Sequence, residues 1–104
     1  MARPNRLKLQ ETLETILGST HVYFNPPSNV KMVYPAIRYN LHDIRVNSAD
    51  NRSYISNDYW DITLIDTTPD SSFVEAILSL PYCTLQRPMY PAEGLYHWVF
   101  SIYF

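Results

Sequence analysis

The side chains that could carry chemistry in this chain of 104 residues are few and widely spaced. The three histidines, His21, His42 and His97, fall in different predicted strands or strand ends, and none forms a helical pair with another. Cys83 has no cysteine or histidine within four residues, whereas a zinc site uses four ligands that usually come in local pairs. The sequence therefore predicts no metal site.

Cys83 is the only candidate thiol nucleophile. A Cys–His pair remains open at this stage, because catalytic partners meet only in the folded chain. The cysteine closely follows Pro81, which ends a predicted helix, and it lies in a predicted strand, where a small buried hydrophobe is the expected role. A single cysteine also excludes an intrachain disulfide, so no oxidising compartment is implied.

The carboxylates do not form a catalytic pair. Asp58 and Asp61 lie three residues apart in a predicted strand, so their side chains point to opposite faces. Asp66 and Asp70 flank a predicted helix start, where acidic side chains stabilise the helix dipole. With only two glycines, the chain also lacks a loop that could cradle a phosphate. We therefore expect no enzyme activity and no cofactor.

The composition is that of one folded domain, with 46% hydrophobic and 17% charged residues. A net charge of -2 argues against a nucleic-acid-binding surface built on bulk positive charge. No run approaches the roughly 18 apolar residues of a membrane span, and the N-terminal region lacks the apolar segment of a signal peptide. We expect a soluble protein that is made inside the cell and has no membrane partner.

Aromatic residues are the unusual part of the composition, with nine tyrosines. Tyrosine suits both strands and protein interfaces. Binding of single-stranded nucleic acid needs aromatic platforms with basic residues around them, and Arg38 between Tyr34 and Tyr39 is the nearest approach. A small nucleic-acid-binding module is therefore one alternative function, but the acidic balance and the missing basic groove weigh against it.

The first part of the chain predicts a helix from Asn5 to Leu17, with Gly18 as its C-cap. A short run from His21 to Asn25 follows it, with Val22 and Phe24 on one face, and a proline-rich turn comes next. The helix prediction rests on an apolar stripe at helical spacing, which consists of Leu9, Leu13, Ile16 and Leu17.

Two alternating segments in the middle of the chain predict a pair of strands. Val33–Asp43 and Tyr54–Asp66 both alternate at period two, and we expect them to form an antiparallel hairpin. The segment between them, Ile44–Ser53, is polar and rich in turn-forming residues. It predicts a loop that is much longer than a hairpin needs, and such loops are often functional.

A second helix is predicted from Pro69 to Leu80. Thr68 is suited to be its N-cap, and Pro69 and Asp70 favour its first turn. Pro81 ends it.

The rest of the chain predicts two more strands. The first runs from Tyr82 to Met89, and Pro88 and Pro91 bracket its connection to the last strand, with Glu93–Gly94 as the turn. Leu95–Phe104 alternates with an unbroken apolar line at its even positions. We expect Phe104 to be tied into the sheet, because a free chain end frays.

These elements predict a single α+β domain over residues 1–104, with a mainly antiparallel sheet of four to five strands and two helices packed on one face. Each helix has one apolar stripe to bury, which makes this the economical arrangement. The predicted core consists of Leu9, Leu13, Leu17, Ile37, Trp60, Ile62, Leu64, Phe73, Ile77, Trp98 and Phe100.

Short strings along most of the chain carry a resemblance to a known family. They are Tyr34-Pro35-Ala36-Ile37-Arg38-Tyr39, Ala49-Asp50-Asn51, Tyr59-Trp60-Asp61-Ile62-Thr63-Leu64-Ile65-Asp66, Pro69-Asp70-Ser71, Leu80-Pro81-Tyr82-Cys83 and the terminal strand from His97 to Phe104. In the order of its elements and in these strings, the chain resembles the small tail-completion and tail-terminator proteins of long-tailed (siphovirus-like) bacteriophages.

The resemblance implies an α+β virion structural protein that forms a homohexameric ring at the head-proximal end of the tail tube. Such a ring stops tail polymerisation and joins the tail to the head, and DNA passes through its lumen without specific binding. The implied partners are further copies of the chain, the major tail tube protein and the head connector or stopper protein. The implied location is the tail or neck of the virion, assembled in the host cytoplasm. A head-completion or stopper protein of the neck is the nearest alternative.

A ring needs two different matching patches on each subunit. We expect the loop from Asn47 to Ser53 to form one patch, because it is long, polar and arm-like. The expected interface residues within this loop and on the strand faces near it are Tyr34, Arg38, Asn47, Ser48, Asp50, Asn51, Arg52 and Tyr59.

Overall fold

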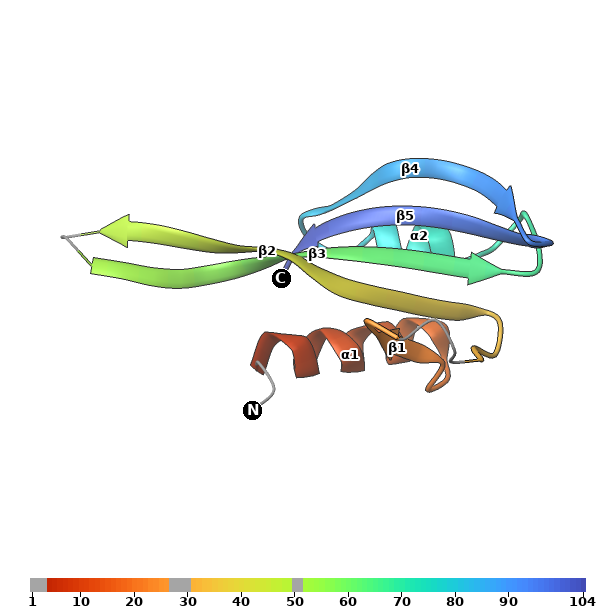
Figure 1. The fold of residues 1–104 in the computed structure, drawn as a ribbon, viewed down its shortest axis with the longest axis horizontal. Coiled ribbons are helices and arrows are strands. Elements are labelled where there is room, and N and C mark those ends of the chain that lie inside the picture. Colours follow the sequence, from red (N-terminus) through yellow and green to blue (C-terminus); the bar gives the residue numbers. More distant parts are fainter. Residues whose placement is uncertain (1–3, 27–30, 50–51) are drawn as a thin grey trace.

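The computed structural model describes residues 4–26, 31–49 and 52–104. Two helices and five strands follow one another along these residues (Figure 1). In chain order they are α1 (Pro4–Leu17), β1 (Val22–Phe24), β2 (Ala36–Ala49), β3 (Arg52–Asp66), α2 (Phe73–Leu78), β4 (Cys83–Ala92) and β5 (Leu95–Tyr103).

The five strands form one sheet in the order β1-β2-β3-β5-β4. The pairs β2–β3, β3–β5 and β5–β4 are antiparallel, and only β1 runs parallel to its neighbour β2. The predicted α+β fold with a mainly antiparallel sheet is therefore confirmed, as is the pairing of the two middle strands. The parallel edge strand β1 makes the sheet a mixed one.

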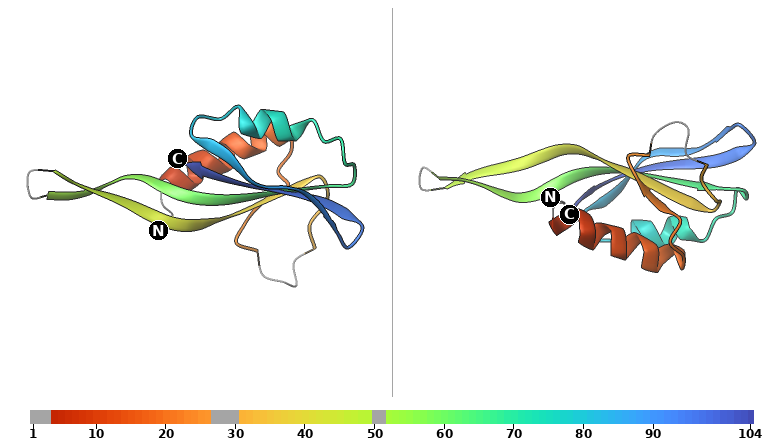
Figure 2. Two further views of the ribbon diagram at one scale, coloured as in Figure 1. Left: turned by 90° about the horizontal axis from the view of Figure 1, so that it is seen from above. Right: turned by 60° about the horizontal axis from the view of Figure 1, so that its bottom comes forward.

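Both helices lie on one face of the sheet, and the core lies between the two layers (Figure 2). Ten of the eleven predicted core residues are buried in this core, and the eleventh, Phe73, is half-buried against it. Val22, Tyr39 and Ile102 complete the buried cluster. They come from β1, β2 and β5, whose apolar faces were correctly assigned by their period of two.

Helix α1 matches the prediction to within one residue. It ends because Gly18 adopts a left-handed backbone with φ of 74° and donates its N–H to the carbonyl oxygen of Glu14 at 2.8 Å. Gln10 tethers the helix to the sheet, since its amide nitrogen donates to the carbonyl oxygen of Val22 at 3.0 Å and its amide oxygen accepts the Tyr39 hydroxyl. No helix in the described part of the chain is long and apolar enough to cross a membrane.

Helix α2 is shorter than predicted and begins at Phe73 rather than Pro69. The Thr68 hydroxyl accepts the N–H of Asp70 at 3.3 Å, two residues later, so it closes a local turn and does not cap a helix. Ser72 occupies the N-cap position and makes no side-chain capping bond. The second helix is therefore confirmed, but its predicted start at Pro69 was wrong, because Thr68 begins a turn there.

The prediction of a long loop at Ile44–Ser53 was wrong. Strand β2 continues to Ala49 and β3 begins at Arg52, so most of this polar segment lies in a two-stranded ladder. The polar composition misled the prediction, because the hydrogen bonds of a ladder join main-chain groups and do not require apolar side chains. The result is a long hairpin that projects from the rest of the domain (Figure 1).

Strand β4 also differs from the prediction, since it passes through both Pro88 and Pro91. It is an edge strand, where a missing N–H can be tolerated, and its register with β5 shifts after Leu85 and again after Arg87. The turn Glu93–Gly94 connects it to β5 as predicted, and both turn residues have positive φ, as a tight two-residue hairpin turn requires.

The final strand β5 is an inner strand between β3 and β4. Its last hydrogen bonds are reciprocal ones with Asp58: Phe104 donates its N–H to the Asp58 carbonyl oxygen at 2.9 Å and accepts the Asp58 N–H at 3.1 Å. The expectation that Phe104 is tied into the sheet is confirmed.

Candidate functional site

The feature that sets this domain apart is the projecting end of the β2–β3 hairpin, which we call the hairpin arm and define as residues 44–49 and 52–57. It accounts for much of the long axis of a molecule with extents of 51 × 26 × 22 Å (Figures 1 and 2). The ladder of the arm pairs Val46 with Ile55, Asn47 with Tyr54, Ser48 with Ser53 and Ala49 with Arg52.

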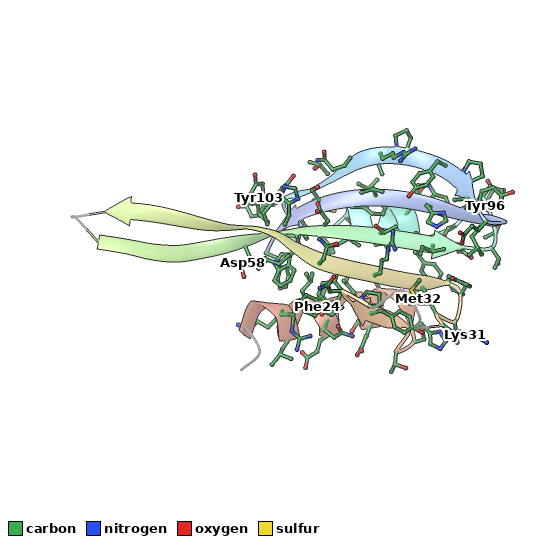
Figure 3. The ribbon with its side chains drawn as sticks, in the orientation of Figure 1. Phe24, Lys31, Met32, Asp58, Tyr96 and Tyr103 are labelled. Carbon is green, nitrogen blue, oxygen red and sulfur yellow. The ribbon has the colours of Figure 1, made fainter. Side chains whose placement is uncertain are left out.

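The hairpin arm is a ribbon of two strands only. Strand β5 accompanies β3 from Tyr59 to Asp66, and β1 accompanies β2 from Ile37 to Tyr39, so neither reaches the arm. Asp58 and Tyr103 lie where the arm leaves the sheet (Figure 3). A two-stranded ribbon is marginally stable in water, and its outer edges carry main-chain donors and acceptors. The arm is therefore suited to contact with another molecule.

A second candidate surface is the face of the sheet opposite the two helices, which we call the open sheet face. Its buried members are Ala36, Thr63, Ile65 and Ser101, so side chains of the same subunit already close much of it. The strand register places three rows across it from β2 to β4: Ala36, Ile65, His97 and Tyr90; Arg38, Thr63, Val99 and Arg87; and Asn40, Asp61, Ser101 and Thr84.

Contacts between neighbouring strands hold the polar and aromatic groups of the open sheet face in place. The rings of Tyr59 and Tyr103 stack with centroids 4.6 Å apart, and His42 Nδ1 lies 2.8 Å from an Asp61 carboxylate oxygen.

At the other end of the face, the Tyr90 ring stacks on the His97 ring with centroids 5.0 Å apart. The Arg87 guanidinium carbon lies 3.8 Å from the centroid of the Tyr90 ring. These rings are engaged within the subunit, so they are poor platforms for stacking the bases of a nucleic acid.

The imidazole of His97 gives the open sheet face a pH-dependent contribution to stability. Burial lowers the pKa of His97 below its ordinary value of 6.5, and the positive charge of Arg38 lowers it further. The unfolded chain then binds a proton more readily than the folded one. The contribution of His97 to the free energy of unfolding is therefore fully present above pH 6.5 and is lost as the pH drops from there through the folded pKa.

We predict that a His97→Phe variant, which can keep the stack on Tyr90 but cannot bind the proton, loses less stability on acidification than the wild type. Urea midpoints of both proteins at pH 7.5 and pH 5.5 test this. Equal losses in the two proteins would show that His97 does not contribute to the pH dependence.

The structure distributes the expected interface residues over three separate places. Arg38 and Tyr59 lie on the open sheet face, and Tyr34 precedes β2 at the end of the sheet far from the arm. Because a strand rises about 3.3 Å per residue, Tyr34 and Asn47 lie roughly 40 Å apart along the chain. Asn47, Ser48 and Arg52 belong to the arm, where their backbones form part of its ladder. Asp50 and Asn51 lie outside the described residues.

Sequence reasoning missed most of the groups on the open sheet face, among them Asp61, Arg87 and Tyr90. Their strands were predicted, but the pairing of Tyr90 with His97 depends on two register shifts in β4. The alternation of the last strand was a signal for this surface, because its odd-numbered positions, which include His97 and Tyr103, fall on the face opposite its apolar line.

The other candidate sites are a metal site, the thiol of Cys83 and a depression on the surface. Among the described residues, no group of three or more histidine, cysteine or acidic side chains could hold a metal ion. Cys83 pairs with Ile102 and packs against the core, and burial raises its pKa to about 11, so its thiolate is scarce at neutral pH. These features are typical of the small hydrophobe that the sequence predicts at this position. A shallow polar depression of about 410 Å³ beside α1 is lined by Glu11, Glu14, Thr15, Ser19 and Thr20.

Comparison with known proteins adds no relative: no protein-family model matches the chain, and no curated protein matches its sequence.

Proposed function

We propose that this protein is a structural subunit of a long-tailed bacteriophage and acts as a tail terminator. In this proposal, copies of the chain form a homohexameric ring at the head-proximal end of the tail tube. The ring stops tail growth and provides the surface on which the head connector or stopper protein docks. Genomic DNA passes through its lumen without specific binding, which a chain with a net charge of -2 does not hinder.

The hairpin arm is the observation that carries this proposal. A projecting two-stranded ribbon buries little surface within its own subunit, and a neighbour can supply the missing cover. In a closed ring of identical subunits, each arm contacts the next subunit in the same direction, so every arm has a neighbouring subunit to pack against. The resemblance to the tail-terminator family, carried by strings on both sides of the arm, favours a ring over an open chain of subunits.

The open sheet face does not favour a different class of function. Its aromatic rings contact one another and Arg87, and its two exposed arginines are accompanied by Asp61. This arrangement lacks the free aromatic platforms and the continuous basic groove of a nucleic-acid-binding module.

The proposal is tested by the assembly state of the purified protein, alone and mixed with tail tubes. Native mass spectrometry and negative-stain electron microscopy should show six-membered rings, either in solution or at the ends of tubes. Deletion of the gene should give tails of uncontrolled length that do not join heads. Tails of normal length attached to heads in the deletion mutant would show that the terminator assignment is wrong. Tails of normal length that fail to join heads would favour the stopper alternative.

A further inference from the structure

Two exposed apolar side chains belong to α1 and β1, the elements at one lateral edge of the sheet. Leu7 on α1 is 50% exposed and Phe24 on β1 is 40% exposed. The guanidinium of Arg6 lies 4.8 Å from the centre of the Phe24 ring, so a positive charge accompanies this apolar surface. Phe24 lies between β2 and α1 in Figure 3. We call Arg6, Leu7 and Phe24 the β1-edge patch.

A second apolar group lies at the opposite edge, on α2, β4 and the turn between them. Leu78 is 38%, Tyr82 74% and Leu85 41% exposed. Leu85 lies on the helix-covered side of β4, because it pairs with Phe100 of the core. Glu75 is exposed one turn before Leu78 on α2 and gives this surface a negative charge. We call Glu75, Leu78, Tyr82 and Leu85 the β4-edge patch.

Tyr82 sets the β4-edge patch apart from ordinary surface. Its φ is 60°, a left-handed conformation that is uncommon for a bulky aromatic residue. Such strain tends to persist where surrounding structure or function requires it. The side chain held in this conformation is a large aromatic ring that is mostly in solvent.

Strand β4, at the edge of the sheet, also disfavours the addition of a strand from another molecule through main-chain hydrogen bonds. Pro88 and Pro91 lack an N–H, and the register shifts after Leu85 and Arg87 interrupt the regular spacing of the strand. A partner at this edge must therefore be recognised by side chains rather than by adding a strand to the sheet.

We propose that the β4-edge patch of one subunit docks on the β1-edge patch of a second copy of this chain. This inference rests on the proposed ring and names its subunit contact. The two patches lie at opposite ends of the strand order, so the contact is head-to-tail and repeats in one direction, as ring closure requires (Figure 1). Their charges are complementary, with Arg6 on one patch and Glu75 on the other, which fixes the orientation of the contact.

Crosslinking through single cysteines tests the contact directly. Cys83→Ser removes the native thiol, and Phe24→Cys and Leu85→Cys are then introduced separately and together. With a short bismaleimide, an equimolar mixture of the two single variants should give covalent dimers, and the double variant should give a ladder of larger species. Each single variant alone should remain monomeric on a denaturing gel. Efficient self-crosslinking of Leu85→Cys would indicate a two-fold contact and overturn the proposal.

A charge exchange gives an independent test. Glu75→Arg changes an exposed side chain and should weaken ring formation at least tenfold, while the urea midpoint falls only slightly because Glu75 lies in the first turn of α2. Arg6→Glu should weaken it similarly, and the two changes together should restore it. The matched control is Glu11→Arg, which reverses an exposed charge of α1 outside both patches.

The outcomes separate this inference from the proposed function. If wild-type rings form and neither crosslinking nor the charge exchange responds, the edge contact is wrong and the ring remains. If the wild-type protein stays monomeric in solution and on isolated tail tubes, the proposed function fails and the edge contact fails with it.

Discussion

A Trp60→Ala variant is expected to lose about 3–5 kcal/mol of unfolding free energy, a large share of the roughly 5–15 kcal/mol that stabilises a domain. Trp60 is fully buried in β3 and its ring centroid lies 5.8 Å from that of Tyr39 and 6.2 Å from that of Phe24. These contacts join three strands of the sheet in one aromatic cluster. Truncation leaves a cavity that the surrounding strands can only partly fill.

Urea or thermal unfolding of the purified variant measures this loss, and two neighbouring changes provide the comparison. Tyr59→Ala removes the adjacent aromatic ring of the same strand, which is half-buried on the open sheet face, and is expected to cost about 1 kcal/mol. Trp60→Phe should cost less than Trp60→Ala, because it keeps part of the ring volume and removes an indole N–H that has no partner among the described residues. Equal midpoints for Trp60→Ala and Tyr59→Ala would contradict the central role of Trp60.

The elements that sequence predicted well are those whose side-chain period alone decides their structure. The apolar stripe from Leu9 to Leu17 fixes both the existence of α1 and the face that it buries. The alternation in β3 and β5 likewise assigns Trp60, Ile62, Trp98 and Phe100 to the core before any pairing is known. In each case one buried face is enough to specify the element.

The errors in the predicted elements have a different physical origin. They concern hydrogen-bond and strand-pairing partners that the local sequence does not determine. Strand β1 pairs in parallel with residues 37–39, and nothing in its own residues selects that partner. The Thr68 hydroxyl could either cap a helix or accept a hydrogen bond in a local turn, and in the structure it accepts the N–H of Asp70 in a turn. The strand pairing of the arm was missed because main-chain pairing is independent of polar composition.

The candidate surfaces were therefore predicted only in outline. An extended element near Asn47–Ser53 was expected, but as a loop, and its separation from Tyr34 follows only from the length of β2. The contacts of the open sheet face require the register of four strands at once. Tyr59 meets Tyr103 in the unshifted register of β3 with β5, whereas Tyr90 meets His97 only after both register shifts of β4 have been placed.

Shortening the hairpin arm is expected to abolish ring formation while leaving the domain folded. Val46 and Ile55 are direct ladder partners, so replacing the residues from Asn47 to Tyr54 by Asn-Gly connects them through a favourable two-residue hairpin turn. The removed segment pairs only with itself among the described residues, and the core lies elsewhere. The unfolding free energy should therefore change by less than about 0.5 kcal/mol.

Ring formation should respond very differently, because the variant lacks the part of the subunit that reaches furthest from its own core. We expect monomers in native mass spectrometry, uncapped tubes in electron microscopy, and virions whose tails vary in length and do not join heads. The matched control is Glu93→Asn in the tight turn between β4 and β5, which introduces the same Asn-Gly turn sequence far from the arm and should assemble normally. Rings of normal yield from the shortened protein would show that the arm has no interface role, and the ring would then have to be held by the sheet edges alone.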